Sequence, residues 1–484
     1  YLLIYENKFY ENVKNRLTDK LYSDFINSDY EKLLSFNPSN ITRTTVSSVN
    51  DAFLYLQSLL GIYKESLAIF AIFLIILLVN PITVIVIFLL FFMISLTYYE
   101  FLRPFLHNAG EKNQIILSKV IKTLNETFGS IKELRILNKE KKIKDNFSSD
   151  IYVYNKNFFY FSIIQRLPKI ILEIFFLATL MLATIYFLNQ NQNFLSIVPE
   201  LALYTLISLR FIPAFNSMSS NFTYLKIGEA SIRIIFNDLK KLNEKSNTKR
   251  NLFESSKKKL PQLKSYIYLE NLSYKYPNKN LISLKDINGG IDKGENVVIT
   301  GTTGSGKTTL VNLMLGFLKP QSGNIYFTGK SIFEFSNRWI EQVSYVSQSC
   351  YLMDRSIMDN ITFNFSNEKI DRKKLEKSLL LSNLDEFIKS LPDRESTKVG
   401  NDGVKLSGGE RQRIALARAI YKNSNIIFMD EFSSALDVRT EEFIFKNLIE
   451  EFKDKTIITI SHRENIIKNC DKKFILNQGT LKIL

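Results

Sequence analysis

The chain has 484 residues, of which 45% are hydrophobic, and its formal net charge is +15. This length allows two or three domains, and no basic patch with interleaved aromatic residues predicts a nucleic-acid partner. The two cysteines, Cys350 and Cys470, are too few and too far apart for a disulfide framework or a cysteine metal site.

The N-terminal half predicts a helical membrane domain over residues 1–236. Residues 1–50 predict a helix pair that turns near Phe25–Tyr30. Apolar runs then predict four membrane spans, at about 58–79, 82–99, 167–188 and 201–219. Apolar residues on all helix faces argue against the alternative, which is that these runs are buried helices of a soluble protein.

A tight hairpin is predicted between the first two spans. No residue from Ser66 to Tyr99 is charged. As one helix this run would measure roughly 50 Å, whereas the hydrocarbon core of a bilayer is ~30 Å thick. Asn80-Pro81 in the middle of the run favours a turn, because proline ends helices and asparagine tolerates turn geometry.

The distribution of lysine and arginine predicts the orientation in the membrane. These residues are frequent in 100–169 and absent from Asn80-Pro81 and from 189–199. Cytoplasmic segments carry the excess of positive charge, so the long segments are expected to face the cytoplasm. Residues 100–166 keep apolar positions at helical spacing, which predicts long projecting helices with a turn near Gly129-Ser130.

A few charged residues lie within or beside the predicted spans, namely Lys64, Glu65, Lys169, Glu173 and Arg210. For Lys64, Glu65 and Lys169 the favoured interpretation is a side chain that reaches the membrane interface. Arg210 lies in the middle of its span. A salt bridge within the helix bundle and a cationic lining for an anionic substrate both remain open for it.

The second half begins after a predicted linker and is expected to be a soluble α/β domain. The linker, 237–262, is rich in Lys, Asn, Ser and Glu and shows no periodicity. The soluble domain covers 263–484.

The soluble domain contains a phosphate-binding loop. Its residues fit the pattern G-x-x-x-x-G-K-[ST] at every fixed position: Gly301-Thr302-Thr303-Gly304-Ser305-Gly306-Lys307-Thr308. An apolar strand, 296–300, precedes the loop, and a helix that includes Thr309 follows it. Backbone N–H groups of such a loop bind phosphate oxygens. We expect ATP to bind here, with Lys307 on the β- and γ-phosphates and Thr308 on Mg²⁺.

Two further apolar strands end in residues that suit ATP hydrolysis. The first, 425–431, ends in Asp430 and Glu431. Asp430 can hold Mg²⁺ through water, and Glu431 can polarise the attacking water. The second, 456–462, ends in His462, which could contact the γ-phosphate.

Residues 263–484 resemble the nucleotide-binding domain of ATP-binding cassette (ABC) proteins. The segment 406–410, Leu-Ser-Gly-Gly-Glu, is similar to the family signature, although Glu410 stands where glutamine is commoner. The remaining matches are Gln348 for the glutamine loop, Ser434-Ala435-Leu436-Asp437 for the D-loop, His462 for the switch histidine and Tyr276 for the aromatic residue that stacks on adenine.

This resemblance implies roles for the matched residues. Glu431, His462 and Gln348 would be catalytic, and Gln348 would also be a ligand of Mg²⁺ beside Thr308 and Asp430. The loop residues 301–309 and Tyr276 would bind ATP. In the family two domains meet head to tail, so Ser407, Gly408 and Gly409 would face the γ-phosphate held by a second copy, which implies a homodimer.

The whole chain resembles a type I ABC exporter. The fold class implied is an α-helical transmembrane domain, with four of six spans present, followed by an α/β P-loop ABC ATPase domain. The first two spans are expected upstream of Tyr1. The turns near Phe25–Tyr30 and Glu126–Glu133 would be coupling helices. The implied location is the bacterial inner membrane, with the ATPase domain in the cytoplasm.

The substrate class is suggested by two short segments. Residues 167–173 and 209–213 resemble parts of bacterial flippases for lipid-linked oligosaccharides. Lys169 and Arg210 would then contact an anionic lipid diphosphate. The alternatives are an exporter of hydrophobic peptides or drugs, a soluble ABC-type ATPase of DNA repair or translation, and a non-transporting pseudogene product.

Overall fold

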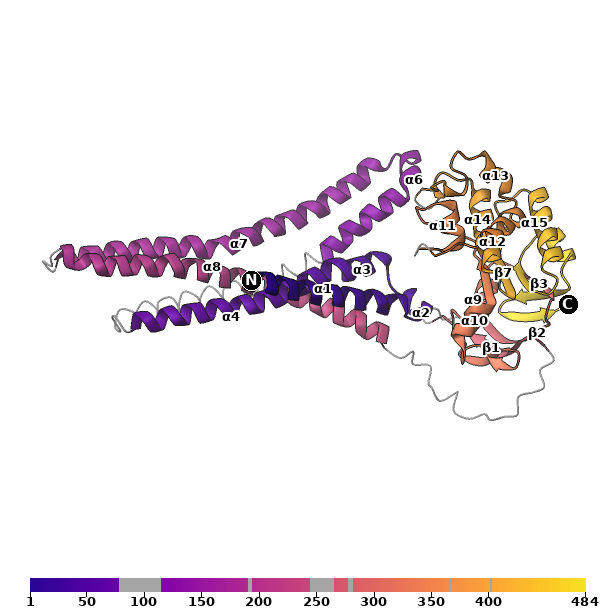
Figure 1. Ribbon diagram of the computed structural model, residues 1–484, viewed down its shortest axis with the longest axis horizontal. Helices are drawn as coiled ribbons and strands as arrows, with labels where there is room; N and C mark the ends of the chain where they lie inside the picture. The colour runs from indigo at the N-terminus through magenta and orange to yellow at the C-terminus, as the bar shows by residue number, and fades with distance from the viewer. Residues whose placement is uncertain (78–114, 190–193, 244–264, 277–281, 366–367, 401–402) are drawn as a thin grey trace. The chain divides into compact units, whose positions relative to one another are not determined.

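The computed structural model describes the chain except for residues 78–114, 190–193, 244–264, 277–281, 366–367 and 401–402 (Figure 1). Contacts divide the chain into two compact units, Tyr1–Lys245 and Ser246–Leu484. Each unit contains its own clusters of buried apolar residues.

The described residues of the N-terminal unit are helical apart from short connections. The labelled helices are α1 (Leu2–Ile26), α2 (Tyr30–Leu33), α3 (Pro38–Thr42), the π-helical turn η1 (Arg43–Ser48), α4 (Val49–Leu77), α6 (Ile131–Ile136), α7 (Glu140–Asn189) and α8 (Phe194–Asn243). A further helix covers 115–129, and a turn at Ser130 separates it from α6. Because α3, η1 and α4 follow one another without a break, they form one continuous helical segment.

Helix α4 packs along α8, and two glycines allow the close approach. At Gly228 of α8, an added Cβ would lie 2.4 Å from the Cβ of Tyr55. At Gly61 of α4, an added Cβ would lie 2.5 Å from the side-chain nitrogen of Asn221. Any larger residue would therefore push the two helices apart. Leu21 of α1 joins the same unit's core, which also contains Val49, Ala52 and Ile235.

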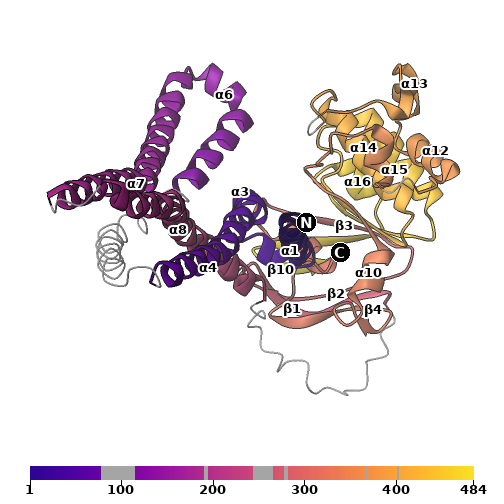
Figure 2. The same ribbon diagram turned by 60° about the vertical axis from the view of Figure 1, so that its left-hand side comes forward.

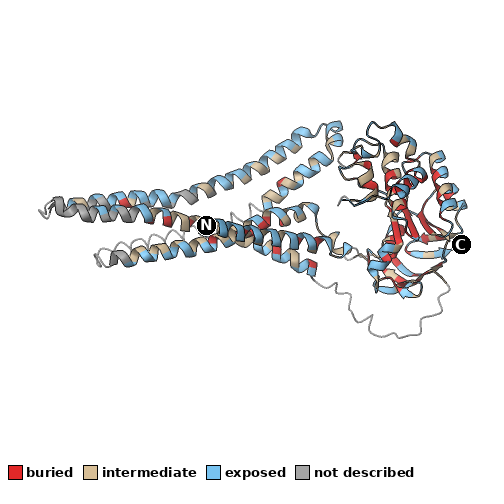
Figure 3. Ribbon diagram, in the orientation of Figure 1, coloured by how far each residue is buried: buried red, intermediate tan, exposed pale blue. Residues whose placement is uncertain are grey.

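Many residues of α4 and α7 are exposed (Figure 3), and large apolar residues are among them. They include Leu59, Leu60, Tyr63, Leu67, Phe70 and Leu74 of α4, and Ile170, Ile171, Ile174, Leu177, Met181 and Ile185 of α7. Within the described residues, one helical stretch, Pro38–Leu74, is long and apolar enough to cross a membrane. An apolar surface of this extent is unusual for a soluble protein and suits contact with lipid or with other helices.

The predicted spans fall on longer helices. Span 58–79 begins inside α4, span 167–188 lies inside α7, and span 201–219 lies inside α8. The span predicted at 82–99 and the hairpin at Asn80-Pro81 lie outside the described residues. Both α7 and α8 extend well beyond the predicted spans, toward 140 and 243 respectively.

The linker prediction was wrong at its N-terminal end. Helix α8 continues to Asn243, so residues 237–243 are helical. The reason is that Leu239 packs against the cluster of Leu21 and Ile235, and Leu242 is buried. The composition of this stretch is polar enough to suggest a linker, but its apolar residues keep helical spacing. The rest of the predicted linker, from 244, lies outside the described residues.

The C-terminal unit is an α/β structure. Its strands are β1 (Ile267–Tyr274), β2 (Leu284–Ile291), β3 (Asn296–Gly301), β4 (Ser322–Phe327), β5 (Lys330–Ser331), β6 (Val343–Val346), β7 (Ile426–Asp430), β8 (Thr456–Ile460), β9 (Lys472–Asn477) and β10 (Thr480–Ile483). Its helices are α9 (Lys307–Met314), α10 (Ser336–Gln342), α11 (Ile357–Thr362), α12 (Arg372–Leu381), α13 (Asp385–Ser390), η3 (Arg394–Ser396), α14 (Gly408–Lys422), α15 (Val438–Glu451) and α16 (Glu464–Lys468).

The strands form two sheets. The larger has the order β10-β9-β3-β8-β7-β6, in which all pairs are parallel except β10 with β9. The smaller sheet is antiparallel, with the order β2-β1-β4-β5. β7 and β8 are buried along their whole length, as expected for parallel strands covered on both faces.

Helices gather at the end of this unit that lies away from the small sheet. In both views, α12 to α15 lie on one side and β1, β2 and α10 on the other (Figures 1 and 2). Helices α11 and α12 pack on α14, whose Ile414 and Ala417 belong to the same buried cluster as Ile357 and Leu375. This packing fixes α14 against the body of the domain.

Candidate functional site

The predicted site residues meet at one edge of the large sheet. Strands β3, β8, β7 and β6 are neighbours and run parallel, so their carboxyl ends lie at the same edge. The chain leaves β3 into the phosphate loop, β7 into Glu431, β8 toward His462 and β6 toward Gln348. The topology therefore brings together four segments that are far apart in the sequence.

The phosphate loop depends on glycine at particular positions. Gly301, Gly304 and Gly306 have φ values of +148°, +82° and +103°, which other residues rarely adopt. At Gly301, an added Cβ would also lie 2.2 Å from the carbonyl oxygen of Leu476. These glycines let the chain turn sharply from β3 into α9, so that the loop precedes the N-terminus of that helix.

The loop carries polar side chains that suit a phosphate chain. Lys307 is only 8% exposed, and its Nζ donates to the carbonyl oxygens of Gly301 (2.8 Å) and Thr302 (3.1 Å). The hydroxyl of Ser305 is buried and has no hydrogen-bond partner among the described residues. An added Cβ at Gly304 would meet nothing within 4 Å, so the loop is open on that side. Thr302, Thr303 and Gly304 are exposed there, and the arrangement fits an anion.

The carboxylate of Asp430 lies in a buried and electrostatically strained position. Burial raises its pKa to about 6, and the neighbouring charge of Glu431 adds to the rise. Lys307 and hydrogen bonds from Tyr345 and Thr308 act in the opposite direction. A carboxylate bonded to a threonine hydroxyl at the start of the loop helix is a suitable place for a divalent cation, which would stabilise the charged form.

Glu431 lies close to two other predicted site residues, Gln348 and His462. The side-chain nitrogen of Gln348 donates to Glu431 Oε2 at 2.6 Å, and His462 Nε2 lies 3.8 Å from Glu431 Oε1. Glu431 has a φ of +46°, a left-handed conformation that is uncommon for this residue type. Its backbone N–H donates to the carbonyl of Ile460 at 3.1 Å, which helps to hold this conformation. Strained backbone of this kind is frequent at functional sites.

Tyr276 lies beside the loop helix. Its hydroxyl is 3.5 Å from the hydroxyl of Thr309, and its ring packs edge-on against Tyr274 at 5.0 Å between centroids. The ring is half-buried. It is therefore placed next to the helix that follows the phosphate loop, where a base attached to a bound phosphate chain could stack on it.

The Ser-Gly-Gly-Glu segment starts helix α14 with a capping box. Ser407 Oγ accepts from the N–H of Glu410 at 3.3 Å, and Glu410 Oε2 accepts from the N–H of Ser407 at 2.7 Å. This pair gives a physical reason for a glutamate or a glutamine at 410. Gly408 and Gly409 approach the D-loop closely, since an added Cβ would lie 3.2 Å from Ala435 Cβ and 3.1 Å from its carbonyl oxygen respectively.

The signature segment is not joined to the phosphate loop of the same chain. In the described parts of the domain, the hydrogen bonds of Ser407 and of Lys307 connect each to its own segment. Ser407 is exposed, as are Thr302 and Thr303. The arrangement leaves both surfaces accessible to another molecule.

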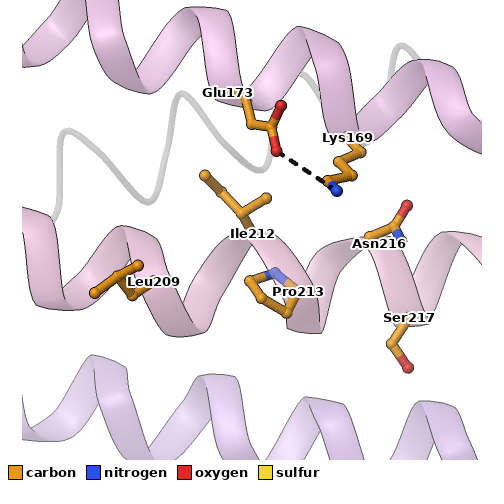
Figure 4. Close-up of a pocket in the computed structure, with 7 residues that line it drawn as sticks. All are labelled: Lys169, Glu173, Leu209, Ile212, Pro213, Asn216 and Ser217. Atoms are coloured by element: carbon orange, nitrogen blue, oxygen red, sulfur yellow. Dashed lines mark ion pairs between the residues drawn. The ribbon is translucent and has the colours of Figure 1, made fainter.

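Lys169 and Arg210, the candidates for substrate contact, do not line the same pocket. A pocket of about 400 Å³ lies between α7 and α8 and is lined by Lys169, Glu173, Leu209, Ile212, Pro213, Asn216 and Ser217 (Figure 4). Lys169 Nζ lies 3.8 Å from Glu173 Oε1, which offsets part of its charge. Arg210 is exposed on α8 and is not among the described residues that line this pocket.

Three residues near the site were missed from the sequence. Tyr345 bonds to Asp430, Gln412 of α14 bonds to the D-loop, and Arg463 also bonds to the D-loop. Arg463 follows His462 directly, so its position in the chain was a usable signal. Nothing in the local sequence distinguishes Gln412 or Tyr345, because their roles depend on contacts across the fold.

Comparison with known proteins agrees with this geometry. Residues 284–434 match the family model described as ABC transporter. This part of the chain is an ABC transporter domain. An "ATP-dependent lipid A-core flippase" of Photobacterium profundum is 32% identical over 229 residues, which cover 47% of this chain and 39% of the relative. The "Alpha-hemolysin translocation ATP-binding protein HlyB" of Escherichia coli O157:H7 is 35% identical over 227 residues, which cover 47% of this chain and 32% of the relative.

A solved structure has the same fold as nearly the whole chain. The structure of a bacterial Atm1-family ABC exporter with ATP bound matches with a TM-score of 0.77 and 19% identity, over 98% of this chain and 83% of the other. The predicted fold class, a helical N-terminal region of the type I exporter fold followed by an α/β ABC domain, is confirmed. The chain spans less than half the length of the curated relatives named above.

Proposed function

We propose that this protein is an ATP-hydrolysing ABC exporter or flippase. The observation that carries the proposal is the arrangement around Glu431, which contacts Gln348 and lies 3.8 Å from His462 beside a glycine-rich phosphate loop. When bound, Mg²⁺-ATP would supply the γ-phosphoryl group and a cation that neutralises its charge.

The chain's own residues would divide the catalytic work. Lys307 would exchange its bonds to the Gly301 and Thr302 carbonyls for bonds to phosphate oxygens. Thr308, Asp430 and Gln348 would hold Mg²⁺, which would favour the ionised form of Asp430. Glu431 would orient the attacking water and polarise it, with His462 nearby to contact the γ-phosphate.

Replacement of Glu431 tests the catalytic part of the proposal. In the full-length protein, Glu431→Gln should lower ATP turnover by roughly 100-fold or more, because it removes the group that polarises water. ATP binding, measured separately by a fluorescent analogue, should persist. Turnover at the parental rate would show that Glu431 is not the catalytic carboxylate.

We further propose that the active form is a homodimer with two composite ATP sites. The exposed Ser407 and the exposed loop residues Thr302 and Thr303 of one chain support this proposal, because they are not joined to each other in the same chain. In the dimer, the N-terminus of α14 from one copy would complete the phosphate site of the other. Glu431, His462 and the signature segment are all present, so both sites would be competent.

Transport across a bacterial inner membrane would be the work that hydrolysis drives. The apolar side chains exposed along α4 and α7 support a membrane-embedded N-terminal unit and disfavour a soluble ATPase of DNA repair or translation. The protein should therefore require detergent or lipid for extraction. Full solubility without detergent would favour the soluble class instead. The short turns near 25–30 and 126–133 would act as coupling helices on the cytoplasmic side.

The substrate we favour is a lipid-linked oligosaccharide or another anionic lipid. The names of relatives include both lipid A-core flippases and a hemolysin translocator, so a hydrophobic peptide or drug remains the second candidate. Arg210 is exposed on α8 rather than paired within the described bundle. It is therefore available to a phosphate group, whereas Lys169 already has Glu173 as a neighbour.

Arg210→Ala tests the anionic substrate. It should abolish the stimulation of ATPase activity by a diphosphate-linked lipid while leaving the basal rate unchanged. Arg210→Lys keeps the charge and is the matched control, which should retain most of the stimulation. If Arg210→Ala responds to the lipid as the parent does, the arginine makes no contact with its phosphates.

A further inference from the structure

The D-loop, Ser434-Ala435-Leu436-Asp437, is bonded to side chains of two different elements. Gln412 of α14 donates from Nε2 to Ser434 Oγ at 2.6 Å and accepts from the N–H of Ala435 at 2.9 Å. From the segment after β8, Arg463 Nη2 donates to the carbonyl oxygen of Ser433, which directly precedes the D-loop (2.9 Å), and to that of Leu436 (3.2 Å). The loop is therefore bonded to the signature helix and to the segment that follows β8.

Arg463 is itself anchored by a buried acid. Its Nη1 bonds to Glu441 Oε2 of α15, and the side chain of Glu441 is 1% exposed. The Arg463 backbone N–H also donates to Ser461 Oγ at 3.1 Å, so the short segment around His462 is bonded within itself. The guanidinium group uses its planar fork to join one carboxylate and two carbonyls, which an ammonium group could not do with the same geometry.

The position of Arg463 in the chain gives this contact its significance. It is the residue after His462, whose imidazole lies 3.8 Å from the carboxylate of Glu431. A shift of the D-loop would pull on Arg463 and hence on the backbone that carries His462. A shift of α14 would be transmitted to the D-loop through Gln412. The described contacts thus connect the signature helix, the D-loop and the histidine in one series.

We propose that Arg463 is a positioning residue that sets the place of His462 relative to Glu431 according to the position of the D-loop. The proposal rests on the ATPase activity proposed above and adds a residue to it. In the composite site, α14 serves the phosphate of the second copy. The series from α14 to His462 then lets the state of one site affect the geometry of the other.

If Arg463 only stabilised the fold, its replacement would give different results from those that a positioning role predicts. The two roles can therefore be separated by experiment. Without the guanidinium, the buried carboxylate of Glu441 loses its partner, which destabilises the fold whatever the residue does in catalysis. Glu441→Gln removes that charge. The informative comparison is therefore between Glu441→Gln alone and the double variant Arg463→Met/Glu441→Gln, since neither leaves an uncompensated buried charge.

The experiment measures kcat, the KM for ATP and the thermal midpoint of the full-length protein. The double variant should have a kcat about tenfold below that of Glu441→Gln, since displacing a reacting group by a fraction of an ångström has effects of this order or larger. The affinity for ATP, measured under conditions without turnover, should change less than twofold. In the protein that keeps Glu441, Arg463→Lys should have a kcat between those of the parent and of the double variant. The reason is that the ammonium can reach some of the three acceptors.

A matched control is Lys422→Met. Lys422 also bonds to two carbonyl oxygens, those of Ile340 and Val343, both at 2.7 Å, but at the opposite end of β6 from Gln348. The Lys422→Met variant should have a lower thermal midpoint than the parent protein and an unchanged kcat.

The outcomes separate this inference from the proposed activity. A double variant with the same kcat as Glu441→Gln, in a parent that hydrolyses ATP, would overturn the positioning role and leave the ATPase proposal standing. An equal fall of kcat in Lys422→Met would overturn it too, since loss of any cation that bonds to two backbone carbonyls would then suffice. A parent protein without ATPase activity would instead refute the proposed function.

Discussion

At the scale of single residues, Asp430 shows how the site stores electrostatic strain. Its carboxylate is 2% exposed and lies beside Glu431, and its pKa is raised to about 6. An enzyme that needs a cation at this position gains from such a carboxylate, because a bound cation relieves the repulsion between the two carboxylates.

This strain predicts a dependence of stability on pH in the absence of nucleotide and metal. Between the ordinary value of 3.8 and about 6, the folded protein holds a proton that the unfolded chain has released. Stability should therefore fall as the pH rises through this window, by on the order of 3 kcal/mol. Asp430→Asn removes the charge, so its thermal midpoint should match the parent near pH 4 and exceed it at pH 7, although the proposed ATP hydrolysis should be lost.

Asp437 provides a control of opposite sign. A hydrogen bond from Thr440 lowers the pKa of this exposed carboxyl, so it stabilises the fold at neutral pH and less so in acid. Relative to the parent protein, Asp437→Asn should therefore not gain stability as the pH rises. If Asp430→Asn shows no gain at pH 7 over the parent, the carboxylate of Asp430 is not under strain.

At the scale of elements, the crossing of α4 and α8 depends on glycine. We expect Gly228→Ala to destabilise the N-terminal unit by about 1–2 kcal/mol, because the new methyl group would overlap Tyr55 and the carbonyl of Asp51, and this exceeds the gain in helix propensity. The thermal midpoint in detergent measures the effect.

Gly129→Ala is the matched control for this substitution. Gly129 ends the helix over 115–129, and an added Cβ there would meet nothing within 4 Å. The same change should leave the midpoint unaltered or raise it slightly. Equal loss in both variants would point to a general effect of alanine rather than to the helix crossing.

Local sequence predicted those elements whose cause is local. The strand at 296–300 and the strand before Asp430 were found because short apolar runs stand beside motifs of fixed spacing, and they are β3 and β7. The antiparallel sheet of β1, β2, β4 and β5 was not predicted, since its pairing joins segments with no such marker. Likewise, 237–243 read as linker because packing of Leu239 is invisible in composition.

The site was predictable by family resemblance more than by spacing. The phosphate loop stands on its own pattern, but the meeting of Gln348, Glu431 and His462 follows from the order of the parallel strands. The position of Arg463 directly after His462 marks it as close to the site, but its contacts with the D-loop and those of Gln412 could not be predicted from sequence. Each of these side chains bonds to backbone groups about twenty to thirty residues away, and the burial of Glu441 is set by tertiary packing.

At the scale of the whole molecule, the composite ATP site makes a geometric prediction about two chains. In one chain Ser407 and Thr303 are both exposed and share no hydrogen bond in the described residues. In the proposed dimer, ATP bound to the loop of one copy brings the Ser407 of the other copy close to it. A cysteine at each position should then form a cross-link between chains, but only when ATP holds the sites closed.

The test uses Ser407→Cys with Thr303→Cys in a protein that also carries Glu431→Gln, so that bound ATP is not consumed. Cys350 and Cys470 are first replaced by serine; burial raises the pKa of the Cys470 thiol to about 12, so its removal should not disturb a reactive group. With ATP and a mild oxidant, a product of twice the chain mass should appear on a non-reducing gel. Lys307→Ala in the same background should reduce it, because the loop then holds ATP weakly. A dimer product of equal yield without ATP, or a link confined to single chains, would contradict the composite site.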